Sequence, residues 1–284
     1  MSGTLYLVGT PIGNLGDLSP RGEQALRDAD FIAAEDTRVT MKLLNHFDIR
    51  KPLVSYFEHN KYASGAKILE RIIAGENCAL VTDAGMPAIS DPGEELVRMC
   101  AESGVEVLVV PGPAALVSAV ALSALPSGRF CFEGFLSTAN KSRREHLESL
   151  CGEKRTMIFY EAPHKLVETL GDLYDVLGDR DIALGRELTK LHEERVEFRL
   201  SAGYPKEPRG EFVLLVEGAG SENALNALSP EAHIAPGARL CVPTGLSVQP
   251  QQPGLAGFVY SRSGLGARDG LTVAQGVGVI DPDY

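Results

Sequence analysis

The chain lacks several features that would assign it to a class at once. Its 284 residues include no tryptophan and only five cysteines, none of them in a Cys-x-x-Cys pair. The cysteines are scattered along the chain: Cys78, Cys100, Cys131, Cys151 and Cys241. Because an odd number of scattered thiols fits neither a disulfide framework nor a zinc site, we expect reduced cysteines in a cytoplasmic protein that holds no metal.

Long apolar runs and an excess of positive charge are also missing. No apolar run approaches the ~20 residues that span a bilayer, so no membrane partner is expected. Residues 1–8 have no basic region before a short apolar run and predict a first strand, not a signal peptide. The net charge of -11 argues against a broad basic surface for nucleic acid and leaves room only for a local patch.

What the chain does contain is an alternation of short apolar runs with helical patterns. The runs that predict strands in the first half are 5–8, 31–34, 52–56, 79–81 and 105–110. Ser19 and Pro20 predict an N-cap and first position of a helix that extends to about Ala29. The alternation indicates βαβ units and a mostly parallel sheet. The Val-rich run 105–110 predicts a strand that is buried on both faces.

Residues 79–93 form the stretch on which the interpretation depends most. An apolar run ends in Asp83-Ala84-Gly85, and Asp91-Pro92-Gly93 precedes a helical pattern. Such a strand delivers a loop to the carboxyl edge of a parallel sheet, where α/β proteins bind ligands. Gly85 would let a ligand approach the backbone, and Asp83 would accept hydrogen bonds. The alternative is a plain turn in which Asp91 is an N-cap and nothing binds.

Other loops of interest also follow predicted strands. They are 9–17, which is rich in glycine but interrupted by Pro11, 35–38, 57–60 and 111–115. Because the carboxyl ends of parallel strands meet at one edge, these loops should converge there with residues 79–93. This convergence predicts a binding site.

The second half begins near residue 125 and repeats the alternation. Apolar runs predict strands at 130–135, 156–160, from 181, and at 212–216, and 217–221 resembles a linker. We therefore expect an α/β fold with two α/β domains, 1–120 and 121–220, followed by a third segment, 221–284.

A set of motifs in this order resembles the small-subunit ribosomal RNA methyltransferase I family of the tetrapyrrole-methylase fold group. The motifs are 5–15, 34–38, 54–56, 58–60, 82–93, 132–136, 159–165, 186–190 and 209–212. The resemblance covers residues 1–218 and implies two α/β domains with a cleft between them. It further implies S-adenosyl-L-methionine as methyl donor, a cytidine 2′-hydroxyl of 16S rRNA in the 30S subunit as acceptor, and a homodimer.

The resemblance also implies which residues hold the donor. They are Pro11, Asp83, Ala84, Gly85, Pro111, Gly112, Pro113, Ala114 and Tyr160. Methyl transfer needs donor and acceptor in line, and a base or a cation near the hydroxyl would help. The sequence leaves the choice open among Glu35, Asp36, His59, Glu161, Glu187 and Lys190, each of which could equally form a salt bridge or an N-cap.

Local cations would supply the contacts to RNA phosphates. The candidates are Arg38, Lys42, Lys61, Lys141, Arg143, Arg144 and Lys165. Two departures from the family pattern stand out. Met86 occupies a position where threonine is more usual, and residues 198–206, with Tyr204-Pro205, are too short for the helix expected before the last strand.

Residues from about 222 onward resemble an incomplete deoxyuridine triphosphatase, a trimeric all-β enzyme. By that resemblance Arg262 and Ser263 would contact phosphate, Asp281 would orient the attacking water, and Tyr284 would lie near the deoxyribose, with Mg²⁺ required only if the tail were active. An early Ala-Gly-x-Asp-Leu element is absent, so we expect a truncated and inactive fusion partner.

The leading interpretation is an S-adenosyl-L-methionine-dependent rRNA 2′-O-methyltransferase. The alternatives are a small-molecule methylase of the same fold that acts on a tetrapyrrole, dUTP hydrolysis through the tail, and a binding protein that has lost turnover.

Overall fold

The computed structural model describes residues 2–220, 257–259 and 278–280. The chain divides into two compact units, Met1–Ala219 and Gly220–Tyr284, and each is treated by itself. No helix in the described part of the chain is long and apolar enough to cross a membrane.

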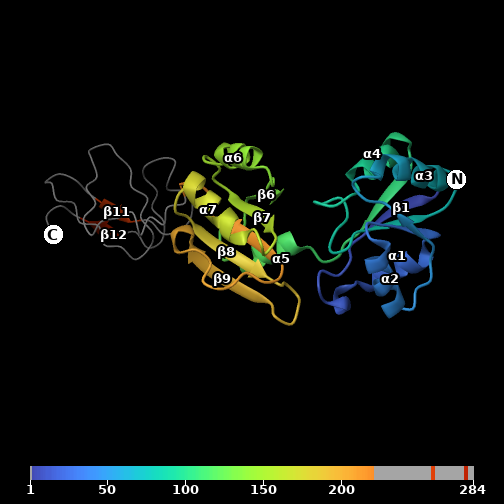
Figure 1. Cartoon of the computed structure of the whole chain (residues 1–284), viewed down its shortest axis with the longest axis horizontal. Helices are drawn as coiled ribbons and strands as arrows, with labels where there is room; N and C mark the ends of the chain where they lie inside the picture. The colour runs from blue at the N-terminus through green and yellow to red at the C-terminus, as the bar shows by residue number, and fades with distance from the viewer. Residues whose placement is uncertain (1, 221–256, 260–277, 281–284) are drawn as a thin grey trace. The chain divides into compact units, whose positions relative to one another are not determined.

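The first sheet is entirely parallel and lies in the first half of the larger unit (Figure 1). Its strands are β1 (Thr4–Val8), β2 (Phe31–Ala34), β3 (Leu53–Ser55), β4 (Cys78–Val81) and β5 (Glu106–Val110), in the order β3-β2-β4-β1-β5. The connecting helices are α1 (Pro20–Asp28), α2 (Thr37–His46), α3 (Lys61–Ile73) and α4 (Glu94–Glu102). The predicted βαβ pattern and parallel sheet are confirmed, and every residue of β2 and β4 is buried.

Local signals explain where the first helices begin. Ser19 Oγ accepts a hydrogen bond from Gly22 N at 2.9 Å, which confirms the predicted start of α1. Helix α3 is longer than the predicted pattern 67–74, because it begins at Lys61. Its first half gave no apolar signal, since the buried position there is Gly65, which lies against Tyr56 and Met99.

Strand β5 differs from its prediction. It lies at the edge of the sheet, and the side chains of Leu108 and Val109 are 41% and 53% exposed. The prediction that residues 105–110 are buried on both faces is therefore wrong, because an apolar run does not tell a central strand from an edge strand. Arg21 Nη2 donates to the Val109 carbonyl at 2.7 Å and covers part of this edge.

The second sheet is mixed. Its strands are β6 (Phe130–Phe135), β7 (Thr156–Glu161), β8 (Asp181–Arg186), β9 (Glu194–Arg199) and β10 (Phe212–Val216), in the order β6-β7-β10-β8-β9. Only β6 and β7 pair in parallel, and the other neighbours in this described sheet are antiparallel. The helices of this half are α5 (Ala115–Leu122), α6 (Asn140–Ser149) and α7 (Leu166–Leu177).

The central strand β10 divides the second core. Phe212, Leu214 and Val216 pack in the cluster that contains α6 and α7. Val213 and Leu215 pack in the other cluster, which contains residues of α5. Helices therefore cover both faces of this sheet, as its fully buried central strand requires.

Two remaining expectations concern the end of the chain. After β9 there is only a 3₁₀ turn, Leu200–Ala202, which confirms that residues 198–206 hold no full helix. Strands β11 (Gly257–Val259) and β12 (Gly278–Ile280) form an antiparallel pair. The residues expected to act in the tail, Arg262, Ser263, Asp281 and Tyr284, lie outside the described residues.

Candidate functional site

The loops after β1 and β4 are joined by backbone hydrogen bonds. Thr10 N donates to Gly85 O at 2.9 Å, and Gly85 N donates to Thr10 O at 3.1 Å. The buried Thr10 hydroxyl also donates a hydrogen bond to Thr82 O at 3.1 Å. Gly85 has a φ of 93°, a conformation that strongly favours glycine. These bonds fix the two loops as one unit.

The loop after β5 meets the loop after β1 at a pair of glycines. A Cβ built on Gly112 would lie 2.7 Å from Gly9 O, and a Cβ on Gly9 would lie 2.7 Å from Gly112 N and 2.6 Å from Met86 Sδ. The two backbones thus touch directly, with Met86 packed beside them. The structure therefore brings together three of the predicted donor-binding loops at one sheet edge.

Carboxylates that directly follow β2, and others within residues 82–93, complete this edge. Thr82 Oγ1 donates to Glu35 Oε2 at 2.8 Å, and Asp36 N donates to Asp83 Oδ1 at 3.1 Å. Burial, and then the charge of Glu35, raises the pKa of Asp91 to about 6. The N-cap of α4 is Gly93, so the interpretation of Asp91 as an N-cap is wrong. Asp91 was not among the predicted site residues, because Asp-Pro-Gly before a helix normally indicates a cap.

The raised pKa of Asp91 predicts an unusual dependence of stability on pH. The folded chain holds this proton more tightly than an unfolded aspartate, so the stabilisation from Asp91 is lost as the pH rises from about 4 to about 6. We expect Asp91→Asn to stabilise the protein relative to wild type at pH 7.5 by about 1 kcal/mol, after allowance for solvent screening, and by about a third of that at pH 4.5. Urea unfolding at the two pH values measures this, with Asp17→Asn as the control. Equal differences at both values would contradict it.

Tyr160 connects the second sheet to the loop after β5. Its Oη accepts a hydrogen bond from Leu116 N at 3.2 Å, at the start of α5. The rings of Phe132 and Phe135 pack edge-on against it, with centroids 5.0 and 5.4 Å away. Burial raises the pKa of Tyr160, so the phenol stays neutral. Tyr160 thus holds the end of the segment 111–114.

Lys190 holds the loop after β1 from the other side. Its Nζ lies 2.9 Å from both Glu187 Oε1 and Glu211 Oε2. Burial lowers the pKa of Lys190, but the hydrogen bonds to the two carboxylates outweigh it, and the pKa is raised overall. The methylenes of Lys190 pass over Gly13, where a Cβ would come within 2.3 Å of Cγ. Next to this contact, Ile12 packs with Leu188.

The other predicted bases have different surroundings. Asp36 caps α2, and its hydrogen bonds with Arg38 lower its pKa to about 2. Glu161 is buried and accepts hydrogen bonds from Thr169 Oγ1 and Ala162 N. His59 is exposed beside the Phe57 ring. Among the predicted candidates, Glu35 is the carboxylate that lies next to Asp91 at the joined loops.

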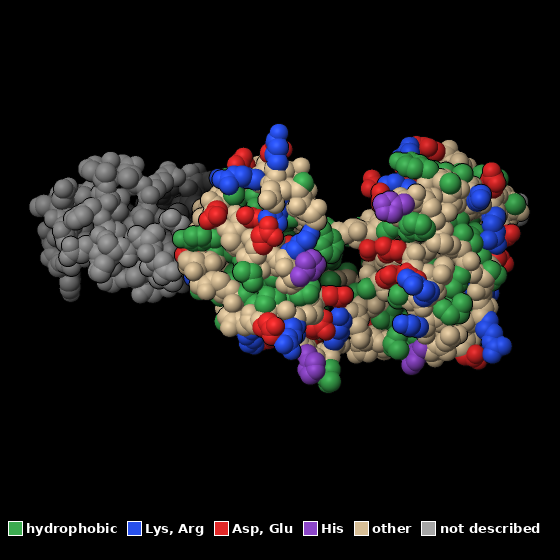
Figure 2. All heavy atoms as spheres, in the orientation of Figure 1, with side chains coloured by type: hydrophobic (Ala, Val, Ile, Leu, Met, Phe, Trp, Pro, Cys, Tyr) green, Lys and Arg blue, Asp and Glu red, His purple; other side chains and the backbone are tan. Residues whose placement is uncertain are grey.

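Most of the predicted RNA-contacting cations have carboxylate partners. Arg143 is buried, pairs with Glu168, and lies 2.6 Å from Asp172 Oδ2. This cation links α6 to α7, and the expectation that it contacts RNA does not fit its position. The exposed members pair as Arg38–Asp36, Lys141–Glu145 and Arg144–Glu148, and Lys165 is half-buried at the start of α7. Figure 2 shows both signs of charge mixed over the visible face, without a broad basic area.

The burial of Arg143 leads to a stability prediction. Arg143→Met removes both ion pairs but leaves carboxylates that are partly exposed, so we expect a loss of about 1–3 kcal/mol in the free energy of unfolding. The exposed neighbour variant Arg144→Met should change it by less than about 0.5 kcal/mol. Urea denaturation compares the two. A stable Arg143→Met protein with weakened RNA binding would instead restore Arg143 as an RNA contact.

Comparisons with known proteins agree with this arrangement. The profile of the Tetrapyrrole (Corrin/Porphyrin) Methylases matches residues 4–202. A solved structure, that of the methyltransferase CobJ, matches with a TM-score of 0.59 at 20% identity, over 77% of this chain and 95% of that one. At that identity the likeness concerns the fold alone.

Two relatives are much more similar in sequence. A Synechocystis protein named ribosomal RNA small subunit methyltransferase I is 51% identical over 226 residues, which are 78% of this chain and 81% of that protein. A Thermotoga maritima protein of the same name is 47% identical over 220 residues, 76% of this chain and 99% of that protein. The chain is thus a methyltransferase that belongs to the tetrapyrrole (corrin/porphyrin) methylase family, in the branch of proteins named ribosomal RNA small subunit methyltransferase I.

Proposed function

We propose that this chain transfers a methyl group from S-adenosyl-L-methionine to the 2′-hydroxyl of a cytidine in 16S rRNA. The observation that carries the proposal is the 51% identity to a relative named ribosomal RNA small subunit methyltransferase I, across 81% of that relative. The joined loops after β1, β4 and β5 support it, since they give the chain a rigid edge suited to a small ligand.

The residues at this edge fit the chemistry of the donor. S-adenosyl-L-methionine supplies a positively charged sulfonium and an electrophilic methyl group. Carboxylates suit its charge and its ribose hydroxyls, and Asp83 is accessible. The close backbones at Gly85 and Gly112 leave no side chain in the way. We assign donor contacts to Pro11, Asp83, Ala84, Gly85, Pro111, Gly112, Pro113, Ala114 and Tyr160.

The acceptor hydroxyl is a weak acid, so a nearby proton acceptor would raise the rate. Of the predicted candidates, Glu35 fits best, because Thr82 orients its carboxylate at the joined loops. Asp91 lies beside it and, with a pKa of about 6, is mostly ionised at neutral pH. Asp36, Glu161, Glu187 and Lys190 are instead occupied by caps, hydrogen bonds or ion pairs.

The remaining expectations belong to the same proposal. We expect a cytoplasmic homodimer that acts on the 30S subunit, with Arg38, Lys141, Arg144 and Lys165 near RNA. Exposed apolar side chains on β5 and α5, among them Val109 and Val117, would suit a surface covered by a second copy.

The experiment is transfer of tritium from labelled S-adenosyl-L-methionine to 30S subunits, with the modified nucleotide mapped. Label in the ribose of a single cytidine is the expected result. Donor binding by calorimetry without transfer would favour a binding protein that has lost turnover. Label in the bases, or none, would overturn the proposed reaction.

A small-molecule methylase of the same fold is the second candidate, because the matching profile is named for corrin and porphyrin substrates. The same labelled donor, incubated with porphyrinoid precursors, separates the two.

The tail carries a smaller proposal. By its resemblance to deoxyuridine triphosphatase, and because the Ala-Gly-x-Asp-Leu element is absent, we propose that it does not hydrolyse dUTP. Pyrophosphate release from dUTP with Mg²⁺ would contradict this.

A further inference from the structure

The ion pairs on α6 change where RNA contacts should be sought. Lys141 and Arg144 each have a glutamate four residues later on the same helix, and Arg143 is buried between two acids. A paired cation gains less from a phosphate than a free one, because the existing partner must be displaced or must share it. The useful cations are therefore those without a carboxylate partner.

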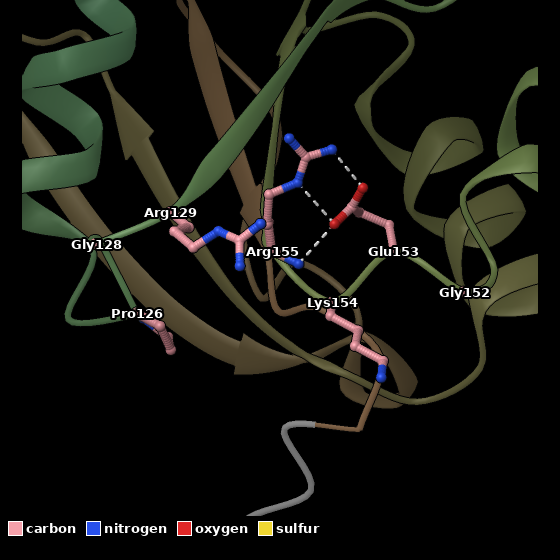
Figure 3. Close-up of a pocket in the computed structure, with 7 residues that line it drawn as sticks. All are labelled: Pro126, Gly128, Arg129, Gly152, Glu153, Lys154 and Arg155. Carbon is pink, nitrogen blue, oxygen red and sulfur yellow. Dashed lines mark hydrogen bonds and ion pairs between the residues drawn. The ribbon is translucent and has the colours of Figure 1, made fainter. Parts of the chain in front are cut away.

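Two such cations line a pocket at the amino ends of β6 and β7. The pocket has a volume of about 600 Å³ and is drawn in Figure 3. It is formed by two short segments, one before each strand: Pro126, Gly128 and Arg129, and Gly152, Glu153, Lys154 and Arg155. Thr156 Oγ1 donates to Pro126 O at 2.7 Å and holds the two segments together. The lining is therefore a fixed part of the second sheet.

The pocket carries net positive charge in an acidic chain. Arg155 pairs with Glu153 at 2.6 Å, and Figure 3 shows this pair as the bonded one. Arg129 and Lys154 are exposed, and neither has an acidic partner among the residues that the structure describes. The residues that line the pocket include three cations and one carboxylate, whereas the whole chain has a net charge of -11.

Each of the two segments has one open position. A Cβ built on Gly128 or Gly152 would meet nothing within 4 Å, so an anion can approach the chain at these two glycines. The backbone of residues 153–155 is already occupied, because Ala219 N donates to Glu153 O and Arg155 N donates to Glu153 Oε1, so the charged side chains must supply the contacts. A guanidinium presents paired donors that match phosphate oxygens, and an ammonium adds a point charge. Arg129 and Lys154 provide one of each.

We infer that this pocket, through Arg129 and Lys154, binds backbone phosphates of the RNA substrate; the inference rests on the proposed function. The pocket lies at the opposite end of β7 from Tyr160. Five residue steps along that strand cover roughly 17 Å, about the length of five stacked nucleotides. The pocket would therefore hold RNA several nucleotides from the reacting ribose and would set affinity rather than chemistry.

The test measures RNA binding by the full chain, without methyl transfer. Fluorescence anisotropy with a labelled 16S rRNA fragment gives the Kd at several salt concentrations. The double variant Arg129→Ala/Lys154→Ala should raise the Kd about 10-fold or more at low salt and reduce the slope of log K against log salt by about 1 to 2. The Kd of this variant for S-adenosyl-L-methionine, measured by calorimetry, should equal that of wild type.

A control with the same change in net charge removes two exposed cations from the first half of the unit, of which Arg98 is paired with Glu95 and Glu102. Lys67→Ala/Arg98→Ala should leave both the Kd and the salt slope close to wild type. If the pocket variant binds RNA as wild type does, the inference is wrong while the proposed function stands. If the wild-type chain binds no RNA and labels no 30S subunits, both are wrong.

Free inorganic phosphate presents the same oxygens to Arg129 and Lys154 as an RNA backbone does. Calorimetry with phosphate alone, on wild type and on the pocket variant, separates RNA binding from binding of a free anion. Phosphate binding that the variant abolishes, with RNA affinity unchanged, would assign the pocket to a free anion and overturn the RNA contact.

Discussion

Replacing Gly112 by alanine is expected to weaken the binding of S-adenosyl-L-methionine at least about 10-fold and to lower the free energy of unfolding by about 1–3 kcal/mol. The added methyl carbon would lie 2.7 Å from Gly9 O and 2.8 Å from Gly9 C. These are backbone atoms, so no rotamer change can make room. The strands cannot move apart either, because Val8 is in register with Val110 and Gly9 N donates to Val110 O at 3.1 Å.

A matched glycine isolates the effect. Gly171 lies within α7, where an added Cβ would meet nothing within 4 Å. Gly171→Ala should stabilise the protein by about 0.5–1 kcal/mol and leave donor affinity unchanged. Calorimetry with the donor and urea unfolding measure both quantities. If Gly112→Ala binds the donor as tightly as wild type, the donor does not lie against the joined loops.

Much of this architecture follows from local patterns. Parallel strands place their carboxyl ends at one edge, so the apolar runs alone predicted that residues 9–17, 79–93 and 111–115 would meet. The Thr10–Gly85 bridge and the Gly9–Gly112 contact are the physical form of that convergence. The pattern carries such information because each loop follows its strand directly in the chain.

The sequence was less informative where a residue's role depends on distant partners. Arg143 looked like its neighbours Lys141 and Arg144, but its acidic partners lie on another helix, 25 and 29 residues further along. The apolar run 105–110 could not reveal that β5 has one neighbouring strand in the described sheet. Asp91 resembled a cap because Asp-Pro-Gly precedes a helix, and its interaction with Glu35, in a different loop, leaves no local pattern. Tertiary position, not local chemistry, decides each case.

Lys190 is the residue for which the difference between local chemistry and tertiary position matters most. Its motif suggested a catalytic cation, whereas its ammonium is occupied by Glu187 and Glu211 and its methylenes cover Gly13. A group held in this way acts through the loop it supports. Lys190 is then a positioning residue for the donor loop, and the difference can be measured.

Gly13→Ala should weaken donor binding about 10-fold, and removing the Lys190 side chain in the same protein should restore most of it. A Cβ on Gly13 would meet Lys190 Cγ at 2.3 Å and Cδ at 3.1 Å. Moving the Lys190 side chain away would break its two ion pairs, and the clash falls on Cγ, near the root of the side chain and not at its flexible end, so part of the strain passes to the loop. Lys190→Ala alone should cost at most about 1 kcal/mol of stability, since the pairs are partly exposed.

The double-mutant cycle of Gly13→Ala and Lys190→Ala therefore predicts a coupling energy above about 1 kcal/mol in donor binding. Gly16→Ala is the control in the same loop, because its Cβ would meet only the Asn14 side chain, at 3.2 Å. A positioning role predicts that Lys190→Ala raises the KM for the donor more than it lowers kcat. A proton acceptor or charge stabiliser would lower kcat and leave donor affinity intact. Additive single effects would show that the contact between Gly13 and Lys190 does not set the loop position.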